Sequence, residues 1–380
     1  MQRIAARRDG PSETLIQNPK SKIQNPEPRI PNPQSRTPSS EPPIPSPEPS
    51  ALSAGLSEMS IQNPKSMIQN SEPQIPDPES PIPNSKSRFK SGFVAVVGRP
   101  NAGKSTLVNA LVGEKVSIVT PAPQTTRNRI LGIVNRAGAQ IILMDTPGIH
   151  KPFSRLNDQM MMFVRQALTE RDLAVLIVDA AEKFGKGDEF TLQFLKEFSP
   201  RTILALNKID VIKKPRLLPL MDQYSKLYDF EEILPISALH GEGFPELLEA
   251  VVRRLPEGPQ YFPPEVYTDQ PERFLASEII REKIIRHTRR ELPYVTAVLI
   301  DDFEEGETLT RIHTTIMVEK ESQKPIIIGA GGARLKQIGT EARQELEKLF
   351  PPKVFLELFV KVEPHWRDNR AVVAELDYRG

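Results

Sequence analysis

The sequence predicts two folded domains behind a proline-rich tail: a larger α/β domain and a smaller α+β domain. Apolar, β-branched runs at 93–97, 140–144, 173–179 and 203–206 alternate with segments of helical periodicity, which is typical of a parallel sheet covered by helices. Towards the C-terminus the order changes to helix, strand, strand, helices and strand. The predicted boundaries are 1–90 for the tail, 91–256 for the first domain, 257–272 for a linker and 273–380 for the second domain.

The composition excludes several classes of protein. The 380 residues contain no cysteine, which removes disulfides, thiolate metal sites and thiol catalysis. A formal net charge of +1 gives no overall attraction to nucleic acid or anionic lipid, so any such contact has to come from a local patch. No apolar run approaches the ~20 residues that span a bilayer, and the N-terminus lacks the apolar core of a secretory signal.

Residues 1–90 are predicted to form a disordered N-terminal tail. This stretch is rich in proline and repeats a seven-residue unit, for example from Ile16, Ile23 and Ile30. A coiled coil needs two apolar positions per heptad and no proline, whereas here one isoleucine stands among polar residues and proline. The tail is either an inert solvated segment or translated short-repeat DNA ahead of an older start site. Loss of activity on trimming the chain to begin near Met67 would contradict the second hypothesis.

The stretch at 93–106 predicts a phosphate-binding loop. Residues 93–97 are typical of a buried strand, and 98–105 fit the pattern G-x-x-x-x-G-K-[ST] at the start of a helix, which disfavours a chance glycine turn. Backbone N–H groups of such a loop attract phosphate oxygens, while Lys104 reaches the β- and γ-phosphates and Ser105 binds Mg²⁺. The predicted nucleotide contacts of the loop are Gly98, Arg99, Pro100, Asn101, Ala102, Gly103, Lys104, Ser105 and Thr106.

Two later segments complete the predicted phosphate site. Thr126 lies in a loop, where its hydroxyl can join the Mg²⁺ shell and its N–H can touch the γ-phosphate. A predicted strand at 140–144 ends in Asp145-Thr146-Pro147-Gly148. Asp145 is expected to hold Mg²⁺ through a water, and the Gly148 N–H to reach the γ-phosphate with no side chain in the way. Each motif alone is common in turns, and their order behind the phosphate loop gives them weight.

The base site is predicted from the motif Asn207-Lys208-Ile209-Asp210, which follows the strand at 203–206. The Asp210 carboxylate can accept from the guanine N1–H and 2-amino group together, a pair that adenine does not offer. Asn207 supports the ring, and Lys208 lays its stem on the face of the base. Ser237 and Ala238 follow a further strand; the Ala238 N–H can meet guanine O6, although an ordinary strand-to-helix turn also explains this pair.

In this order the motifs GRPNAGKS, PQTTRN, DTPG and NKID resemble those of translation-factor-class GTPases and, more closely, of the Era group. The resemblance implies a Ras-like P-loop GTPase domain that converts GTP to GDP and phosphate with Mg²⁺. Lys104, Thr126, Gly148 and Asn101 then have catalytic roles, and Asn101 is a ligand for K⁺. Ile149 stands where many GTPases have a water-orienting glutamine, a feature that the Era group shares, so the catalytic water is positioned by another group.

The second domain resembles a type II KH domain in its order of helix, two strands, G-x-x-G loop, two helices and strand. The linker in front of it is proline-rich and is expected to be stiff and extended. The first helix carries Arg281, Lys283 and Arg286 on a face that is expected to be solvated. The last strand, at 353–362, alternates as in a half-covered sheet, and Trp366 is expected to pack in the core.

The G-x-x-G loop predicts contact with single-stranded RNA, because glycine lets a nucleic-acid backbone approach a helix start and neighbouring apolar residues meet the bases. The alternative is an ordinary helix N-cap turn. Relatives commonly carry charge in the middle of this loop, whereas Ala330 and Gly331 have none, so we expect a salt dependence that is weaker by about one phosphate contact. The predicted RNA contacts are Ile328, Gly329, Ala330, Gly331, Gly332, Arg334, Lys336 and Arg343.

The resemblance to the Era group implies a cytoplasmic, monomeric factor that binds 16S ribosomal RNA near its 3′ end and assists maturation of the 30S subunit. GTP would order the loops of Thr126 and Gly148 and move the KH domain through the linker. Peripheral association with the inner face of the cell membrane is also implied, without an amphipathic anchor in the sequence to support it. Two rivals stay open: a nucleotide-gated RNA-binding scaffold with negligible turnover, which Ile149 allows, and a GTPase acting in RNA modification, for which no second catalytic domain is found.

Overall fold

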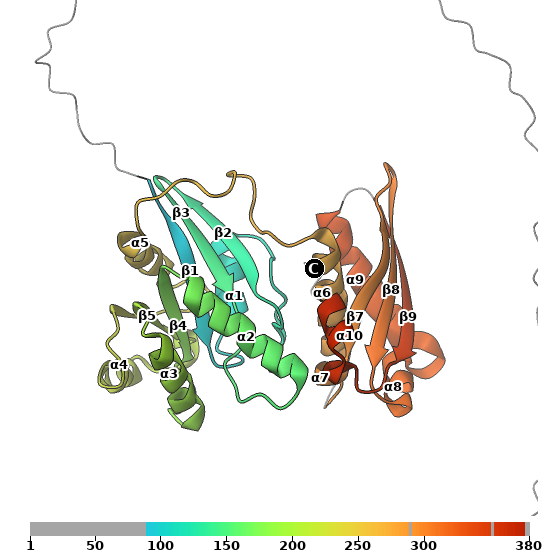
Figure 1. The fold of residues 1–380 in the computed structure, drawn as a ribbon, viewed down its shortest axis with the longest axis horizontal. Helices are drawn as coiled ribbons and strands as arrows, with labels where there is room; N and C mark the ends of the chain where they lie inside the picture. Colours follow the sequence, from blue (N-terminus) through green and yellow to red (C-terminus); the bar gives the residue numbers. More distant parts are fainter. Residues whose placement is uncertain (1–88, 289–290, 351–352, 377–380) are drawn as a thin grey trace, which may run out of the picture. The chain divides into compact units, whose positions relative to one another are not determined.

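The computed structural model describes residues 89–288, 291–350 and 353–376. The predicted tail, residues 1–90, therefore lies almost wholly outside the described residues. The described residues belong to one compact unit. Within it, the described residues form a six-stranded sheet and a three-stranded sheet, each with its own helices (Figure 1).

The first sheet has the strand order β2-β3-β1-β4-β5-β6. Strand β2 runs antiparallel to β3, and the other neighbouring strands are parallel. Because the parallel strands end at the same edge, the motifs that follow β1, β3 and β5 meet there. The bounds are β1 Lys90–Gly98, β2 Ile130–Arg136, β3 Ala139–Asp145, β4 Leu173–Asp179, β5 Thr202–Asn207 and β6 Glu232–Pro235.

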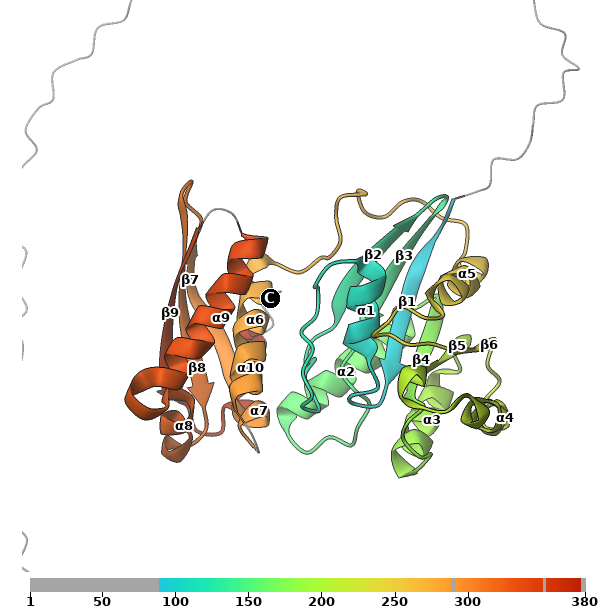
Figure 2. The same cartoon turned by 180° about the vertical axis from the view of Figure 1, so that it is seen from behind.

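Helices cover both faces of this sheet, as the two opposite views show (Figures 1 and 2). The two-residue period of β1 assigns its side chains to two cores: Val94 and Val96 pack with α1 and α5, whereas Ala95 and Val97 pack with α2, α3 and α4. The bounds are α1 Lys104–Val112, α2 Arg155–Glu170, α3 Lys186–Phe198, α4 Leu217–Ser225 and α5 Phe244–Arg254, with the 3₁₀ turns η1 Ile209–Val211 and η2 Lys214–Arg216.

The predicted linker is hydrogen-bonded to strands β2 and β3 at the edge of the first sheet. The N–H of Ile133 on β2 donates to the Tyr267 carbonyl at 3.0 Å. The buried amide of Gln140 donates to the Phe262 carbonyl at 2.8 Å and accepts from two linker N–H groups. Since β2 is an edge strand, the linker satisfies backbone groups that would otherwise be unpaired. The segment is therefore not a free spacer.

The second domain packs helices α6 and α9 on one face of a sheet with the order β7-β8-β9. Strands β7 and β8 are antiparallel, and β8 and β9 are parallel. A single helix, α9, stands where two helices were predicted. The bounds are α6 Glu272–His287, α7 Leu292–Val295, β7 Ala297–Glu304, β8 Leu309–Val318, η3 Glu321–Gln323, α8 Lys324–Ile328, η4 Ala330–Gly332, α9 Ala333–Leu349, β9 Lys353–Val362, η5 Trp366–Asp368 and α10 Arg370–Glu375.

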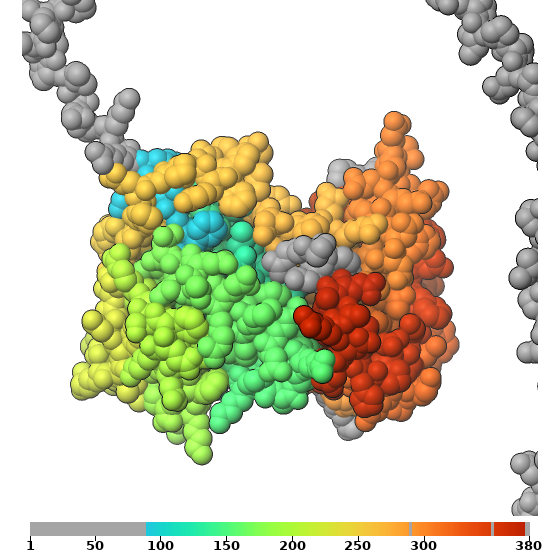
Figure 3. Space-filling model, in the orientation of Figure 1, coloured from blue at the N-terminus to red at the C-terminus, as the bar shows by residue number. Residues whose placement is uncertain are grey.

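Two predictions about this domain have different outcomes. Trp366 is fully buried, and its indole N–H donates to the Val295 carbonyl at 2.8 Å, so its predicted core role is confirmed. It packs with Leu156 of α2. On the surface, red C-terminal residues lie against green ones of the first domain (Figure 3). The prediction of a solvated basic face on α6 is wrong for Arg281 and Lys283, which are 3% and 6% exposed. Within the described segments, no helix has the length and apolar content needed to cross a membrane.

Candidate nucleotide and RNA sites

The three predicted Mg²⁺ ligands meet at the carboxyl edge of the first sheet. The Ser105 hydroxyl lies 2.8 Å from the Thr126 hydroxyl and donates to Asp145 Oδ2 at 2.7 Å. Asp145 is fully buried, and its Oδ1 has no hydrogen-bond partner among the described residues. Burial raises the pKa of Asp145, against the opposing effects of the Ser105 hydrogen bond and the Lys104 charge. A buried carboxylate with a spare oxygen beside two hydroxyls fits a hard divalent cation.

The rest of that cation's shell has to come from elsewhere. In the part of the chain that the structure describes, no three acidic, histidine or cysteine side chains are grouped so that they could hold a metal ion. Mg²⁺ commonly binds one or two carboxylates and completes its octahedron with waters and substrate phosphates.

Lys104 is held inside the phosphate loop. Its ammonium donates to the carbonyls of Arg99 at 2.9 Å and Gly98 at 3.3 Å, and its side chain is buried. Burial lowers the pKa of Lys104 to about 8, although the charge of Asp145 opposes the shift. A phosphate group would replace these carbonyls as the partner of the ammonium and stabilise its charged form. The loop is therefore arranged to gain a buried cation–anion contact when nucleotide binds.

The base loop is tied to the phosphate loop and to its neighbours. Asn207 donates to the Ala102 carbonyl at 2.8 Å, and Ser237 Oγ donates to Asp210 at 2.6 Å, so Ser237 orients the carboxylate that was predicted to select guanine. The Ala238 N–H donates to Asn207 Oδ1 at 2.8 Å. The predicted bond from this N–H to guanine O6 therefore requires the Asn207 contact to be shared or released. Lys208 is anchored by Asp179, a partner that the sequence did not indicate.

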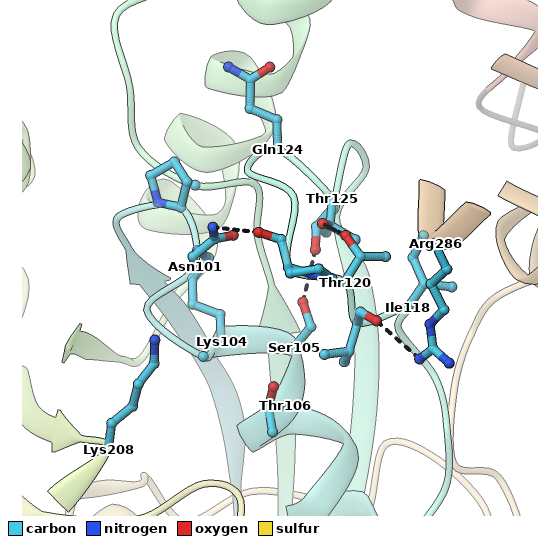
Figure 4. Close-up of a pocket in the computed structure, with 16 residues that line it drawn as sticks. Asn101, Lys104, Ser105, Thr106, Ile118, Thr120, Gln124, Thr125, Lys208 and Arg286 are labelled. Atoms are coloured by element: carbon cyan, nitrogen blue, oxygen red, sulfur yellow. Dashed lines mark hydrogen bonds between the residues drawn. The ribbon is translucent and has the colours of Figure 1, made fainter. Parts of the chain in front are cut away.

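A cavity of about 700 Å³ lies over the phosphate loop. The loop between α1 and β2, residues 113–129, forms one wall and is called the switch loop below (Figure 4). Asn101 reaches this wall and donates to the Pro121 carbonyl at 3.0 Å. Arg286 of α6 also lines the cavity, and sequence reasoning did not place it there.

Three residues of the predicted motifs point away from the cavity. Arg99 forms ion pairs with Asp188 and Glu182, so its guanidinium is turned to α3 and the loop before it. The Thr146 hydroxyl donates to the Val96 carbonyl, which makes it part of the packing of β1 against β3. Ile149 is 3% exposed and belongs to the core, so its side chain cannot position a water.

The G-x-x-G loop opens onto a groove of about 420 Å³ between α9 and β9. Lys336 and Arg343 line the groove from α9, and Leu356 and Leu358 line it from β9. The first turn of α9 has no acidic residue and no side-chain cap, so its N–H groups are suited to a phosphate. The predicted contact Arg334 instead donates to the Ile326 carbonyl of α8. Of the other predicted positions, Gly332 lines the groove. Ile328 ends α8 and packs against the core, and Gly329, Ala330 and Gly331 connect it to α9 without lining the groove.

The parallel sheet has a single antiparallel edge strand, and the phosphate loop follows β1 in the chain. Together these features define a Ras-like P-loop GTPase. The α6–β9 region is a KH domain of the predicted type. In agreement, residues 93–208 match a family model described as 50S ribosome-binding GTPase, and residues 291–367 match one described as KH domain.

Relatives narrow the class further. The chain is 52% identical over 292 residues to GTPase Era of Syntrophus aciditrophicus, covering 76% of this chain and 95% of that protein. It is 50% identical to GTPase Era of Geobacter metallireducens, over 76% of this chain and 98% of the relative. A crystal structure of Era with MgGDPNP and nucleotides 1506–1542 of 16S ribosomal RNA matches with a TM-score of 0.74 and 44% identity, covering 76% of this chain and 99% of the other. A single-residue variant of Aquifex aeolicus Era, bound to GDP and AlF4⁻, matches equally well. The chain belongs to the Era family of GTPases, as its motifs predicted.

Proposed function

We propose that this GTPase binds the 3′-terminal region of 16S ribosomal RNA and assists maturation of the 30S subunit, with residues 91–256 binding nucleotide, 257–272 as linker and 273–380 binding RNA. The observation that carries the proposal is the likeness to Era bound to nucleotides 1506–1542 of that RNA, which extends over both domains. The basic and apolar groove beside the G-x-x-G loop supports it, since single-stranded RNA needs phosphate contacts and apolar surfaces for bases.

Magnesium completes the proposed chemistry. Ser105 and Thr126 would bind Mg²⁺ directly and Asp145 through a water, as their mutual contacts and the spare Asp145 oxygen support. When bound, the ion neutralises charge that develops on the β- and γ-phosphate oxygens. Lys104 binds the same oxygens, and the Gly148 N–H fixes the γ-phosphate. These contacts act by positioning and charge stabilisation, which dominate phosphoryl transfer.

Potassium is proposed as a second cation at Asn101. The Asn101 amide nitrogen donates to Pro121, which leaves its Oδ1 as the side-chain ligand atom. GTP hydrolysis should then be faster in K⁺ than in Na⁺, and Asn101→Ala should remove that difference while GDP affinity stays within about 2-fold. Equal rates of the wild-type protein in the two salts would contradict the proposal. No turnover in K⁺, with or without RNA, would favour the scaffold alternative.

The RNA proposal is tested by titrating a labelled RNA of the sequence 1506–1542 with protein loaded with GDPNP or GDP. We expect tight binding that weakens with salt, and a difference in affinity between the two nucleotide states. A scrambled RNA of equal length is the control. Equal affinity for both RNAs would overturn the proposed target, because phosphate contacts alone do not discriminate sequence.

We also propose that the protein acts as a cytoplasmic monomer that associates peripherally with the membrane. Sedimentation of the full chain with and without anionic vesicles tests the oligomeric state and the membrane association. A dimer in free solution, or no pelleting with vesicles at low salt, would contradict the respective point.

A further inference from the structure

The Mg²⁺ ligand Thr126 is followed in the chain by an arginine that is anchored in the KH domain. The Arg127 guanidinium donates to the carbonyls of Thr296 at 2.9 Å, Pro293 at 3.0 Å and Tyr294 at 3.3 Å. These carbonyls lie at the end of α7, where helix geometry leaves them without partners inside the helix. The guanidinium also lies 5.7 Å from the centre of the Trp366 ring. Hydrogen bonds from a charged donor to several enclosed carbonyls are among the stronger contacts in proteins.

The residue on the other side of Thr126 is held by the KH domain as well. Arg281 of α6 donates to the Thr125 carbonyl. Two hydrogen bonds to Glu278, at 2.7 and 2.6 Å, fix the orientation of the Arg281 guanidinium. Because Arg281 is 3% exposed, water does not compete for this contact. Thr126 thus sits between two arginine contacts that each cross to the second domain.

The start of the switch loop is attached to the same helix. Lys115 forms ion pairs with Glu282 of α6 and Glu345 of α9, and Glu282 is fully buried. Arg286 donates to the Val119 carbonyl at 3.4 Å and to Glu282 at 2.6 Å. The switch loop is therefore held by the KH domain along its length, not only at Thr126.

Resting on the proposed function, we infer that Arg127 and Arg281 are positioning residues that couple the Thr126 hydroxyl to the KH domain. In this structure Thr126 already lies beside Ser105, so the two contacts favour the position in which it can bind Mg²⁺. A KH domain that keeps these contacts raises the affinity for GTP, whose γ-phosphate and Mg²⁺ require Thr126. RNA that favours or disfavours this arrangement changes GTP affinity by the same factor by which GTP changes RNA affinity.

The test uses full-length Arg127→Met, which keeps the length of the side chain but removes its donors. The matched control is Arg129→Met, two residues along, whose guanidinium pairs with Glu170 inside the GTPase domain. We expect Arg127→Met to lose about 10-fold or more in GDPNP affinity in Mg²⁺ while GDP affinity changes by less than about 2-fold. Arg127→Lys should recover part of the loss, because it keeps the charge but not the planar fork.

A second measurement guards against misfolding. RNA affinity in the GDP state should stay within about 2-fold of wild type in Arg127→Met, while the RNA affinity ratio between GDPNP and GDP states falls towards one. Glu278→Gln weakens the hydrogen bonds that orient Arg281. It should lower the ratio of GDPNP to GDP affinity, and the RNA affinity ratio between the two nucleotide states, by a smaller factor than Arg127→Met. If Arg127→Met retains the wild-type nucleotide and RNA ratios, or Arg129→Met loses them equally, the inference is overturned.

These outcomes separate the inference from the proposed function. If wild-type protein does not bind the 1506–1542 RNA, the proposed function fails, and the ratio of GDPNP to GDP affinity still decides whether Arg127 positions Thr126. If wild type binds this RNA in a nucleotide-dependent way that Arg127→Met preserves, the proposed function holds and the inference fails.

Discussion

Substitution of Gly148 by alanine should block the approach of the D-x-x-G loop to the phosphate loop. A Cβ at Gly148 would lie 2.7 Å from Pro100 Cγ, 2.7 Å from its nitrogen and 2.8 Å from its Cα. Ordinary contacts begin near 3.4 Å, so one of the two loops has to move by about 0.7 Å. The neighbouring Ile149 N–H donates to the Gly98 carbonyl at 3.0 Å, which restrains the D-x-x-G loop from yielding.

The substitution should weaken the binding of GTP and not of GDP, because only the γ-phosphate requires the D-x-x-G loop to lie this close to the phosphate loop. Overpacking of this kind costs about 1–3 kcal/mol, equivalent to roughly 5- to 150-fold in affinity. Fluorescence titration with labelled GDPNP and GDP in Mg²⁺ measures both constants. Gly185→Ala is the control, since its Cβ would find its nearest atom at 3.9 Å. An unchanged ratio of GDPNP to GDP affinity in Gly148→Ala would refute the reasoning.

Further predictions concern the base, the RNA groove and the linker. Asp210→Ala should weaken GDP by about 100-fold or more, because two hydrogen bonds to a charged acceptor are lost, whereas the exposed carboxylate Asp222 can be replaced without effect in the same titration. Lys336→Ala should lower the slope of log affinity for RNA against log salt by about 1, whereas Lys348→Ala, on the same helix but outside the groove, should not. Gln140→Leu should lower the free energy of unfolding by about 1–3 kcal/mol and expose the linker to protease, as urea unfolding and limited proteolysis would report.

The sequence predicted those parts of the site that depend on local patterns. A strand followed by a glycine loop and a helix has one common geometry, so residues 98–106 could be assigned from spacing alone. The meeting of Ser105 and Asp145 followed from the rule that parallel strands end at one edge of the sheet, whereas Thr126 was assigned from its position between the phosphate loop and the next strands. The roles of these residues in binding remain predictions, and the structure supports them by bringing the side chains together.

Contacts between distant segments could not be predicted in this way. The carbonyls that hold Arg127 come from a four-residue helix, α7, and backbone carbonyls leave no signature in a sequence. Arg281 and Lys283 were expected in solvent because a basic helix face usually lies there. Arg281 pairs with Glu278, three residues away on the same helix, and Lys283 pairs with Glu345 on a different helix. Only the tertiary fold therefore explains why both cations are buried. Burial of such charges is favourable only when each has a partner.

The hydrogen bonds between the linker and the first sheet limit how a structural change at the nucleotide site can be transmitted to the KH domain. A linker that pairs with β2 and is held by Gln140 moves with the first sheet, so a change at the γ-phosphate cannot be carried by a free extension of this segment. The switch loop, by contrast, contains Thr126 and contacts α6 and α7 directly. Under the inference drawn above, ordering of that loop would act on the KH domain through the Arg127 and Arg281 contacts, and the linker would serve as the fixed end about which the second domain shifts.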